Sequence, residues 1–474
     1  MNTVSKLGKT LKRCIFPCVC TILFITLPLT VNASNKPKNI IYVISDGMGP
    51  SYTAAYRYYM DNTKTDVVET TIFDQLLVGM SSTYSSGTAK AHKRKTYVTD
   101  SAASATALST GFKTYNQAIA MSVDEKPLKT IMEYAKELNK TTGLVVTSQI
   151  NHATPASFVA HNKYRYNYDE IADGYFDNRV NGKFVADLMF GGGQKYFIRK
   201  DRDIAKQFVD AGYQLFTDYN QLSQFNRLPA LGLFADKGMG FAIDNREKFR
   251  LSVMTNKALE LVNTNENGFF LLIEASMVDW CGHDNDIGCA MKEMDDLAKT
   301  VELVKGFIDD NPDTLMVMTA DHNTGGLSIG ANEQYRWDTQ AIKNIRHSMN
   351  YVTQELLKNR SQDVKILWQN LVGIDIEKEQ IDAIIQVRDD ALNAIKKSAN
   401  EDESVINEVI TQERVKIGRL LASITAKNTH TGWTSGNHTG GDVQVFAYGH
   451  SAAQFNGHQD NIDIAKKLFK LIKH

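Results

Sequence analysis

Five short runs of apolar residues stand out along the chain, and the first of them is rich in β-branched side chains. They cover residues 39–45, 141–150, 268–273, 314–319 and 443–448. Continuous apolar runs of this length are typical of strands buried on both faces, as in a parallel sheet. We therefore predict five buried strands.

Helical periodicity follows several of these runs. After the third run, apolar residues recur every three or four positions, at Met291, Met294, Leu297, Val301, Val304 and Ile308. This spacing predicts an amphipathic helix. We expect further helices over 52–60, 127–139 and 460–472, with Pro127 near the first turn of its helix. Residues 155–260 are too weakly periodic to be ordered into elements.

Strands that alternate with helices predict an α/β fold, a three-layer sandwich with a largely parallel central sheet flanked by helices. Residues 331–429 break this rhythm, because they lack proline, are rich in charge and have helical character. We interpret them as an insertion of loops and helices within a catalytic domain formed by 36–330 and 430–474. The alternative is a solvated helical pair with no role.

The first 33 residues differ from the rest of the chain. A basic start is followed by a mostly apolar stretch over 15–31 and by Val31-Asn32-Ala33, which resembles a cleavage site; the basic residues are Lys6, Lys9, Lys12 and Arg13. This pattern predicts a signal peptide over 1–33 and export to the periplasm or the medium. The alternative is an uncleaved anchor. No later stretch has the roughly 18 apolar residues needed to span a bilayer.

Composition adds two constraints. The chain has 474 residues, 43% of them hydrophobic, and a formal net charge of −1, so we expect a sizeable core and no nucleic-acid partner. Of its five cysteines, only Cys281 and Cys289 follow the predicted signal peptide. Export permits a disulfide between them, but free thiols are an equal alternative.

Polar residues come directly after the predicted strands, at their carboxyl ends. Asp46 comes after the first strand, His152 after the second, Glu274 after the third, and Asp321-His322 after the fourth. The carboxyl ends of parallel strands meet at one edge of a sheet, where ligands bind. We therefore expect these side chains to form a cluster.

Asp100-Ser101 opens a run of small residues that ends at Gly111. We place Ser101 at a helix N-terminus, where free N–H groups would favour a serine alkoxide and a bound phosphate. The alternative is an N-cap serine on a tightly packed helix.

Histidine and carboxylate residues recur in the second half of the chain. Asp279 and His283 are four residues apart and can share one face of a helical turn, and His438 lies between glycine-rich segments. Nitrogen and oxygen ligands without thiolates suit zinc in a hydrolytic site with magnesium nearby. The alternatives are a charged helix start for Asp279 and a structural role for His438.

Arg165 is a candidate for binding phosphate oxygens, because its planar guanidinium can bind them in pairs. The alternative is a surface arginine in a tyrosine-rich loop.

Six segments occur in an order and spacing that resemble the alkaline phosphatase family. They are SDGMG, TDSAASATA, HATPASFVAH, IEASMVDWCGH, TADHNTGG and GNHTGGD, and they span residues 40–326 and 437–450. The resemblance implies hydrolysis of small phosphate monoesters at alkaline pH. Ser101 matches the family's nucleophile, which forms a phosphoseryl intermediate, and Arg165 matches the arginine that holds the phosphoryl oxygens.

The resemblance also implies two zinc ions and one magnesium ion. The first zinc, which activates the water that cleaves the intermediate, would be held by Asp279, His283 and His438. The second zinc, which lowers the pKa of the serine hydroxyl, would be held by Asp321 and His322, with Asp46 bridging. The magnesium site would consist of Asp46, Thr154 and Glu274.

Two positions depart from well-known bacterial members, which have Asp and Lys where this chain has His152 and Trp280. An imidazole at the third site favours zinc over magnesium there, and Trp280 removes a cation near the phosphate, so the product should bind less tightly. The segment 331–429 resembles an interface-forming loop of some members, and we expect a homodimer.

Other functions fit the sequence less well. Sulfatases of the superfamily need a modifiable residue followed by x-Pro-x-Arg, whereas Ser101 precedes Ala-Ala-Ser-Ala. A phosphodiesterase remains a close alternative, and export disfavours a glycolytic phosphoglycerate mutase. A metal-binding or adhesion protein without catalysis would not need Ser101, Arg165 and all the ligands together.

Overall fold

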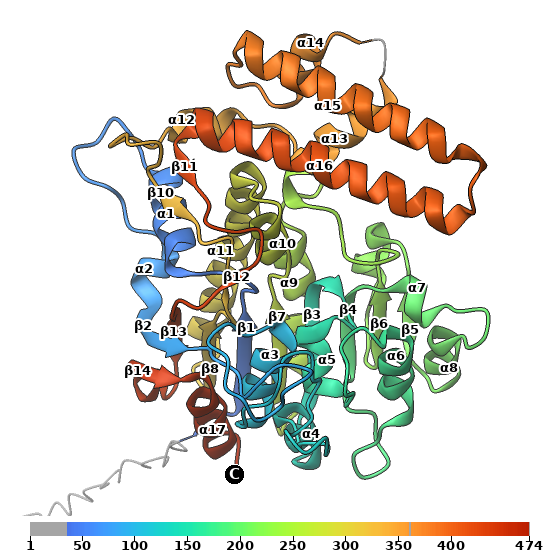
Figure 1. Ribbon diagram of the computed structural model, residues 1–474. Helices are drawn as coiled ribbons and strands as arrows, with labels where there is room; N and C mark the ends of the chain where they lie inside the picture. Colours follow the sequence, from blue (N-terminus) through green and yellow to red (C-terminus); the bar gives the residue numbers. More distant parts are fainter. Residues whose placement is uncertain (1–35, 360–361, 474) are drawn as a thin grey trace, which may run out of the picture. The chain divides into compact units, whose positions relative to one another are not determined.

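The computed structural model describes residues 36–359 and 362–473, so the predicted signal peptide over 1–33 lies outside the described residues (Figure 1). The described part is built around a ten-stranded sheet in the order β14-β2-β13-β8-β1-β7-β3-β4-β6-β5. Its central strands are β8 (Thr314–Thr319), β1 (Asn39–Ile44), β7 (Phe269–Glu274) and β3 (Thr141–Gln149).

Shorter strands extend the sheet on both sides. Beyond β3 lie β4 (Leu188–Gly192), β6 (Ala230–Leu233) and β5 (Gln214–Phe216). Beyond β8 lie β13 (Val443–Gly449), β2 (Leu77–Ser82) and β14 (Gly457–Asp460). Strand β13 is antiparallel to both its neighbours, and the other neighbouring strands of this sheet pair in parallel. The predicted largely parallel sheet is confirmed.

All five predicted strands form, each within one residue of the predicted bounds. The other five strands of this sheet, β2, β4, β5, β6 and β14, were not predicted from the sequence. Glycines interrupt β2, β4 and β6, whose sequences are LVGMSS, LMFGG and ALGL, and β5 has only three residues. Such segments lack the continuous apolar signal of a buried strand.

Alternate residues of the central strands face two separate hydrophobic clusters. In β1, Ile41 and Val43 belong to one cluster, and Ile40, Tyr42 and Ile44 belong to the other. Because successive side chains of a strand point to opposite faces, the sheet is buried on both sides. The predicted three-layer sandwich is therefore confirmed.

Each face has its own helices. The first cluster includes α1 (Pro50–Met60), α2 (Ile72–Leu76), α9 (Arg250–Val262) and α11 (Ile287–Asp310). The second includes α3 (Ser101–Thr110), α4 (Ile131–Glu137), α5 (Ala153–Val159), α6 (Tyr168–Asp177), α8 (Ile204–Asp210) and α17 (Asn461–Leu471).

One predicted helix boundary is wrong. The helix expected from Pro127 begins at Ile131, after Thr130 at its N-cap. Thr130 Oγ1 accepts a hydrogen bond from the backbone N–H of Glu133, whose side chain accepts one from the backbone N–H of Thr130. This reciprocal capping box starts the helix four residues later than a proline at its first turn would, and Pro127 instead forms a β-bridge with Met121.

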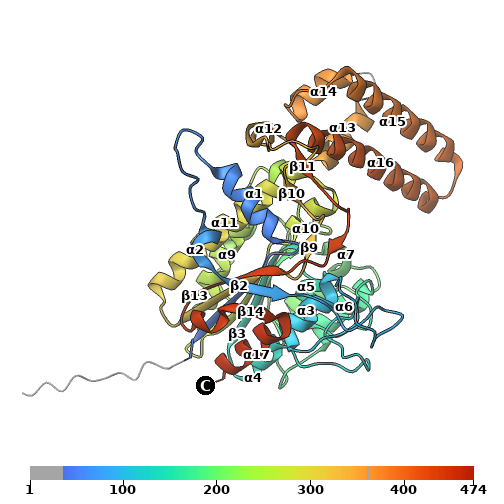
Figure 2. The same ribbon diagram turned by 60° about the vertical axis from the view of Figure 1, so that its left-hand side comes forward.

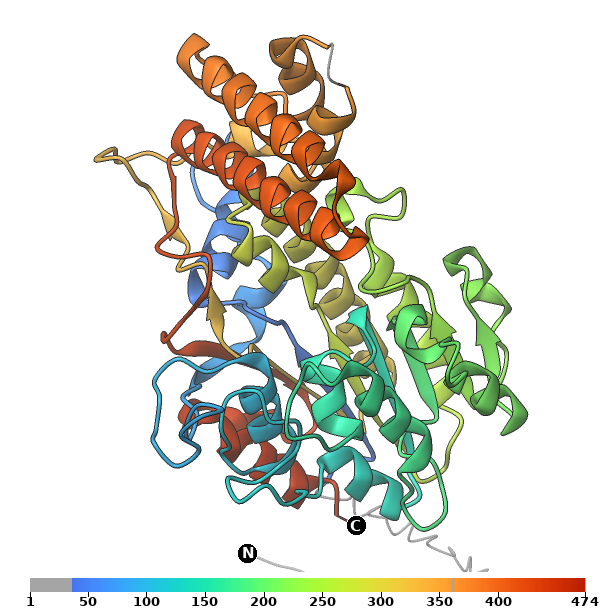
Figure 3. The same cartoon turned by 45° about the vertical axis from the view of Figure 1, so that its right-hand side comes forward.

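Residues between β10 (Ser328–Ile329) and β11 (Thr431–Gly432) are largely helical. They form α12 (Thr339–Asn344), α13 (Met349–Lys358), α14 (Val364–Leu371), α15 (Lys378–Lys397) and α16 (Glu403–Thr429). These helices lie beyond α1 and α11, and α15 and α16 pack side by side (Figures 2 and 3). Their buried residues, among them Trp368 and Leu421, join the first cluster.

A disulfide joins Cys281 of α10 (Met277–His283) to Cys289 in the first turn of α11. This pairing decides between the disulfide and the free thiols that the sequence left open.

Across the described residues, none of the helices has both the length and the apolar character to cross a membrane.

Candidate metal centre

The carboxyl ends of the central strands carry the predicted ligands. Ile44 of β1 pairs with Glu274 of β7 and with Thr319 of β8, so Asp46, Glu274 and Asp321 follow at neighbouring points of one sheet edge. Their oxygens and the nearby imidazole nitrogens form three groups, and within each group the ligand atoms lie within 4.8 Å of one another. The groups are Asp279, His283 and His438; Asp46, Asp321 and His322; and Asp46, His152 and Glu274.

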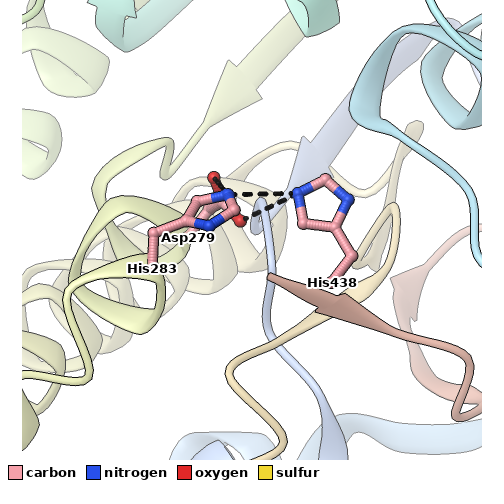
Figure 4. A group of neighbouring side chains, drawn as sticks. All are labelled: Asp279, His283 and His438. Carbon is pink, nitrogen blue, oxygen red and sulfur yellow. Dashed lines mark hydrogen bonds and ion pairs between the residues drawn. The ribbon is translucent and has the colours of Figure 1, made fainter. Parts of the chain in front are cut away.

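The first group joins α10 to β12 (His438–Thr439), as Figure 4 shows. His438 Nε2 lies 3.2 Å from His283 Nε2 and 3.7 Å from Asp279 Oδ1. His283 Nδ1 lies 2.7 Å from the carbonyl oxygen of Gly436, and His438 Nδ1 lies 2.9 Å from that of Thr99. We assign the ring proton of each neutral imidazole to Nδ1, where it is donated to the carbonyl, so the two Nε2 lone pairs face each other. A divalent cation between them fits this donor set.

The three side chains of this first group have pKa values that are shifted in different directions. Burial opposes the charge on Asp279, but the hydrogen bond and charge of His283, with His438 and His322, hold the pKa of Asp279 below its usual range. Burial also opposes the charge on His283, but Asp279 outweighs it and raises the pKa of His283 to about 9. Burial and the charge of His322 lower the pKa of His438 to about 4. Without a cation, one imidazole therefore takes up the positive charge that balances Asp279.

The second group is fully buried and short of positive charge. Asp321 Oδ1 accepts hydrogen bonds from the backbone N–H groups of Gly47 and His322, at 3.1 and 2.9 Å. Neither oxygen of Asp46 accepts a hydrogen bond from any residue the structure describes, although His322 Nε2 lies 3.4 Å from its Oδ1. Burial and the charges of Asp279, Asp321 and Glu274 raise the pKa of Asp46 well above its usual range. A buried carboxylate without donors is costly, and a metal ion would satisfy it.

Ser101 lies beside this second group. It is the first residue of α3, and its Oγ is 3.1 Å from His322 Nε2. Asp100 is the N-cap, because its side chain accepts a hydrogen bond from the backbone N–H of Ala103 over 3.0 Å. The alternative of Ser101 as an N-cap residue is therefore wrong, because its hydroxyl contacts His322 at the helix N-terminus and does not cap the helix.

Arg165 is 8% exposed, so the alternative of a surface arginine is also wrong. Its Nη1 lies 3.1 Å from Asp100 Oδ2, and its Nη2 lies 3.4 Å from His152 Nε2. The ion pair with Asp100 holds the guanidinium beside Ser101, the residue that follows Asp100 in the chain.

The third group is also buried. Ser148 Oγ donates a hydrogen bond to Glu274 Oε2 over 3.1 Å, but burial raises the pKa of Glu274 to about 8. Burial and the charge of Arg165 lower the pKa of His152 to about 3, so this imidazole is neutral and able to ligate a metal. Thr154, in the first turn of α5, is fully buried.

A cleft of about 470 Å³ opens at these groups. Its lining includes Ser101, Arg165, Trp280 and members of the first and third groups, namely Asp279, His283, His438 and His152. The cleft therefore exposes a hydroxyl, a guanidinium and imidazole ligands to one small substrate.

Two residues that contact the ligands, Thr324 and Ser148, were not predicted from the sequence. Thr324, in β9 (Asn323–Thr324), donates a hydrogen bond from Oγ1 to Asp279 Oδ1 over 2.5 Å. It lies two positions after His322, within TADHNTGG, and that position was the only signal in the sequence. Nothing in the residues near Ser148 pointed to its contact with Glu274.

Comparisons with known proteins agree with this geometry. A profile of the alkaline phosphatase family matches residues 37–474. Alkaline phosphatase 3 of Bacillus subtilis is 44% identical over 438 residues, covering 92% of this chain and 89% of the relative. Alkaline phosphatase of Schizosaccharomyces pombe is 33% identical over 463 residues, covering 91% and 81%.

Solved structures show the same fold. The cold-active alkaline phosphatase of the psychrophile Shewanella sp. superposes with a TM-score of 0.80 at 42% identity, covering 92% of this chain and 100% of that chain. The Thermus thermophilus alkaline phosphatase has a TM-score of 0.75 at 27% identity, covering 93% and 92%. The chain belongs to the alkaline phosphatase family of metal-dependent phosphomonoester hydrolases.

Proposed function

We propose that this enzyme hydrolyses small phosphate monoesters at alkaline pH through a phosphoseryl intermediate on Ser101. The observation that carries the proposal is the position of Ser101 Oγ, 3.1 Å from His322 Nε2 and in the same cleft as Arg165. A hydroxyl at a helix N-terminus, beside metal ligands and a guanidinium, has the surroundings that an attacking oxygen needs in phosphoryl transfer.

The residues have separate tasks in this scheme. Arg165, held by Asp100, binds two phosphoryl oxygens and aligns the phosphorus with Ser101 Oγ. Oγ loses its proton to solvent and bonds to phosphorus as the bond to the alcohol oxygen breaks; that oxygen takes up a proton from solvent, and the alcohol leaves. Water then attacks the phosphoserine, which releases inorganic phosphate and restores the hydroxyl of Ser101.

We assign two zinc ions and one magnesium ion to the three groups. The first zinc would be held by Asp279, His283 and His438; the second by Asp46, Asp321 and His322; magnesium by Asp46, Thr154 and Glu274. When bound, these ions would stabilise developing charge on oxygen and lower the pKa of the serine hydroxyl and of water.

The position of His152 allows zinc at the third site as well. An imidazole beside two carboxylates is a better ligand set for zinc than for magnesium. Two structures of the alkaline phosphatase of the Antarctic bacterium TAB5, in which a histidine is replaced by glutamate or aspartate, have magnesium bound in a site named M3. We propose that the third ion of this chain depends in the same way on His152.

Replacing Ser101 by alanine tests the proposal. We expect Ser101→Ala to lower kcat with p-nitrophenyl phosphate by at least about a thousandfold, because the attacking oxygen is gone. Ser109→Ala is the control, since Ser109 is buried in the same helix and donates to the carbonyl oxygen of Ser157 over 2.6 Å. A folded Ser101→Ala variant with full activity would refute the mechanism.

Metal dependence and ester class need separate measurements. Complete chelation should abolish turnover, and adding back zinc and magnesium should restore it. Monoester turnover should exceed diester turnover, and the reverse would favour the phosphodiesterase alternative.

We also propose export, with cleavage after Ala33, and an insertion at 331–429 in a catalytic domain of 36–330 and 430–474. The chain's two neighbouring cysteines form a disulfide, which suits an oxidising compartment. N-terminal sequencing of the mature protein should begin at Ser34.

A further inference from the structure

The Trp280 indole lies between two parts of the chain. It is half-buried on α10, one residue after Asp279, and it lines the cleft. On one side its ring meets the His152 ring edge-on, with centroids 5.7 Å apart and planes at 71°. On another side it meets the loop that follows β6, at Gly238.

No side chain fits at Gly238 while the indole stays where it is. A Cβ atom on Gly238 would lie 2.6 Å from Trp280 Cη2, 2.8 Å from Cζ3, and 2.8 Å from Met277 Cε. Contacts this short force a neighbour to move. Gly238 does not have a left-handed backbone conformation, so glycine is needed there for space.

The loop around Gly238 is held on both sides. Before Gly238, the carbonyl oxygen of Ala235 accepts hydrogen bonds from Gly193 N and Gln194 N, at 2.9 and 3.0 Å. After Gly238, Met239 N donates to the carbonyl oxygen of Thr147 over 2.8 Å, in β3. An added methyl group would therefore displace the indole rather than the loop.

The helix that bears the indole is fixed as well. The residue after Trp280 is Cys281, whose disulfide ties α10 to α11. The indole can therefore yield chiefly by rotating its own side chain. A rotating indole would push against the ring of His152, which it already contacts. His152 Nε2 in turn lies 3.4 Å from Arg165 Nη2.

We propose that Gly238 is a positioning residue for phosphate binding. Its missing side chain lets the indole rest on the loop backbone, which leaves His152 and the Arg165 guanidinium in place. This inference rests on the proposed function, because it assigns phosphoryl binding to Arg165.

The test is a double-mutant cycle on the metal-loaded enzyme. Gly238→Ala should raise KM for p-nitrophenyl phosphate and weaken binding of inorganic phosphate, measured by calorimetry, by about three- to tenfold, a common size for coupling between residues in contact. We expect a smaller effect on kcat. The same substitution should have little effect in a Trp280→Ala background, where no indole remains to be displaced.

Gly240→Ala is the matched control. Gly240 belongs to the same loop, and a Cβ there would meet Asn245 Nδ2 at 3.1 Å instead of the indole. We expect phosphate binding by this variant to match wild type. The proposal is overturned if Gly238→Ala binds phosphate like wild type, or if it weakens binding equally with and without Trp280. A wild-type enzyme with no phosphatase activity would instead refute the proposed function.

Discussion

Thr324 fixes a metal ligand from outside the first group. Its hydroxyl donates to Asp279 Oδ1 and lies 3.3 Å from His322 Nδ1, so one side chain contacts ligands of two groups. Thr324 is fully buried, so its hydroxyl is shielded from bulk solvent. Partners of this kind set the orientation of a ligand and thereby the affinity of a metal site.

We expect Thr324→Val to weaken zinc binding by about tenfold, since valine keeps the volume but cannot donate to Asp279. Zinc release to a competing chelator measures the change. Thr324→Ser keeps the hydroxyl and should retain most of the affinity. Equal zinc affinity in the valine and serine variants would contradict this role.

An ion pair between Glu133 and His161 links helix α4 to the segment that leads to Arg165. His161 Nε2 lies 3.0 Å from Glu133 Oε1, and Nδ1 lies 3.0 Å from the carbonyl oxygen of Ala120. Burial opposes the charge on His161, but the hydrogen bond and charge of Glu133, with the Ala120 carbonyl, raise its pKa. Since the pKa is higher in the folded state, this pair stabilises the fold fully below the unfolded pKa of about 6.5. The stabilisation is lost as the pH rises through the folded pKa.

Glu133→Gln should therefore lower the free energy of unfolding by about 1.5 to 3 kcal/mol at pH 6, the usual size for a hydrogen bond to a charged group. The difference from wild type should shrink as the pH rises. Urea titrations at several pH values measure it. Glu137→Gln, in the same helix, removes an exposed pair with Lys129 and should show no such pH dependence. A deficit that stayed constant with pH would show that the charge on His161 is not involved.

The disulfide joins α10 and α11 across the short turn that follows His283. It closes a loop with a sequence separation of eight residues. Chain-entropy arguments give such a loop about 2 to 3 kcal/mol of stabilisation. We expect the double variant Cys281→Ala and Cys289→Ala to unfold at lower denaturant concentration by that amount, and reduced wild-type protein to approach it. An unchanged unfolding midpoint would show that the turn is held by other contacts.

Assembly is a property of the whole molecule, and we expect a homodimer formed through the segment 331–429. Val405 and Val415 of α16 are 39% and 45% exposed, so glutamate at these positions places negative charge on the surface of this segment without disturbing its buried core. Light scattering should give twice the mass of one chain, and Val405→Glu with Val415→Glu should weaken the dimer. Val67 and Val68, 70% and 46% exposed outside this segment, are the control pair for glutamate substitution. A monomer at all concentrations, or a dimer indifferent to charges on α16, would contradict the interface.

The candidate site was predictable where a ligand follows a strand directly. Asp46, Glu274 and Asp321 could be grouped in advance, because parallel strands bring their carboxyl ends to one edge. Their supporting contacts could not, because Thr324 reaches Asp279 across 45 positions and Ser148 reaches Glu274 across 126. A short polar side chain leaves no periodic signal, so its partner emerges only when the distant strands pair.

Local patterns along the chain were enough to predict the five strands that have continuous apolar runs, the long helix α11 and the acids at the strand ends, because apolar period and residue type act over a few neighbours. Contacts between remote segments decided the rest. These are the antiparallel direction of β13 in the sheet, the contact of His438 with Asp279, the burial of Arg165 and the contact of Gly238 with Trp280. Each of these features depends on which surfaces pack together when the chain folds. The free energy of that packing comes from residues far apart in sequence, so no local pattern reveals it.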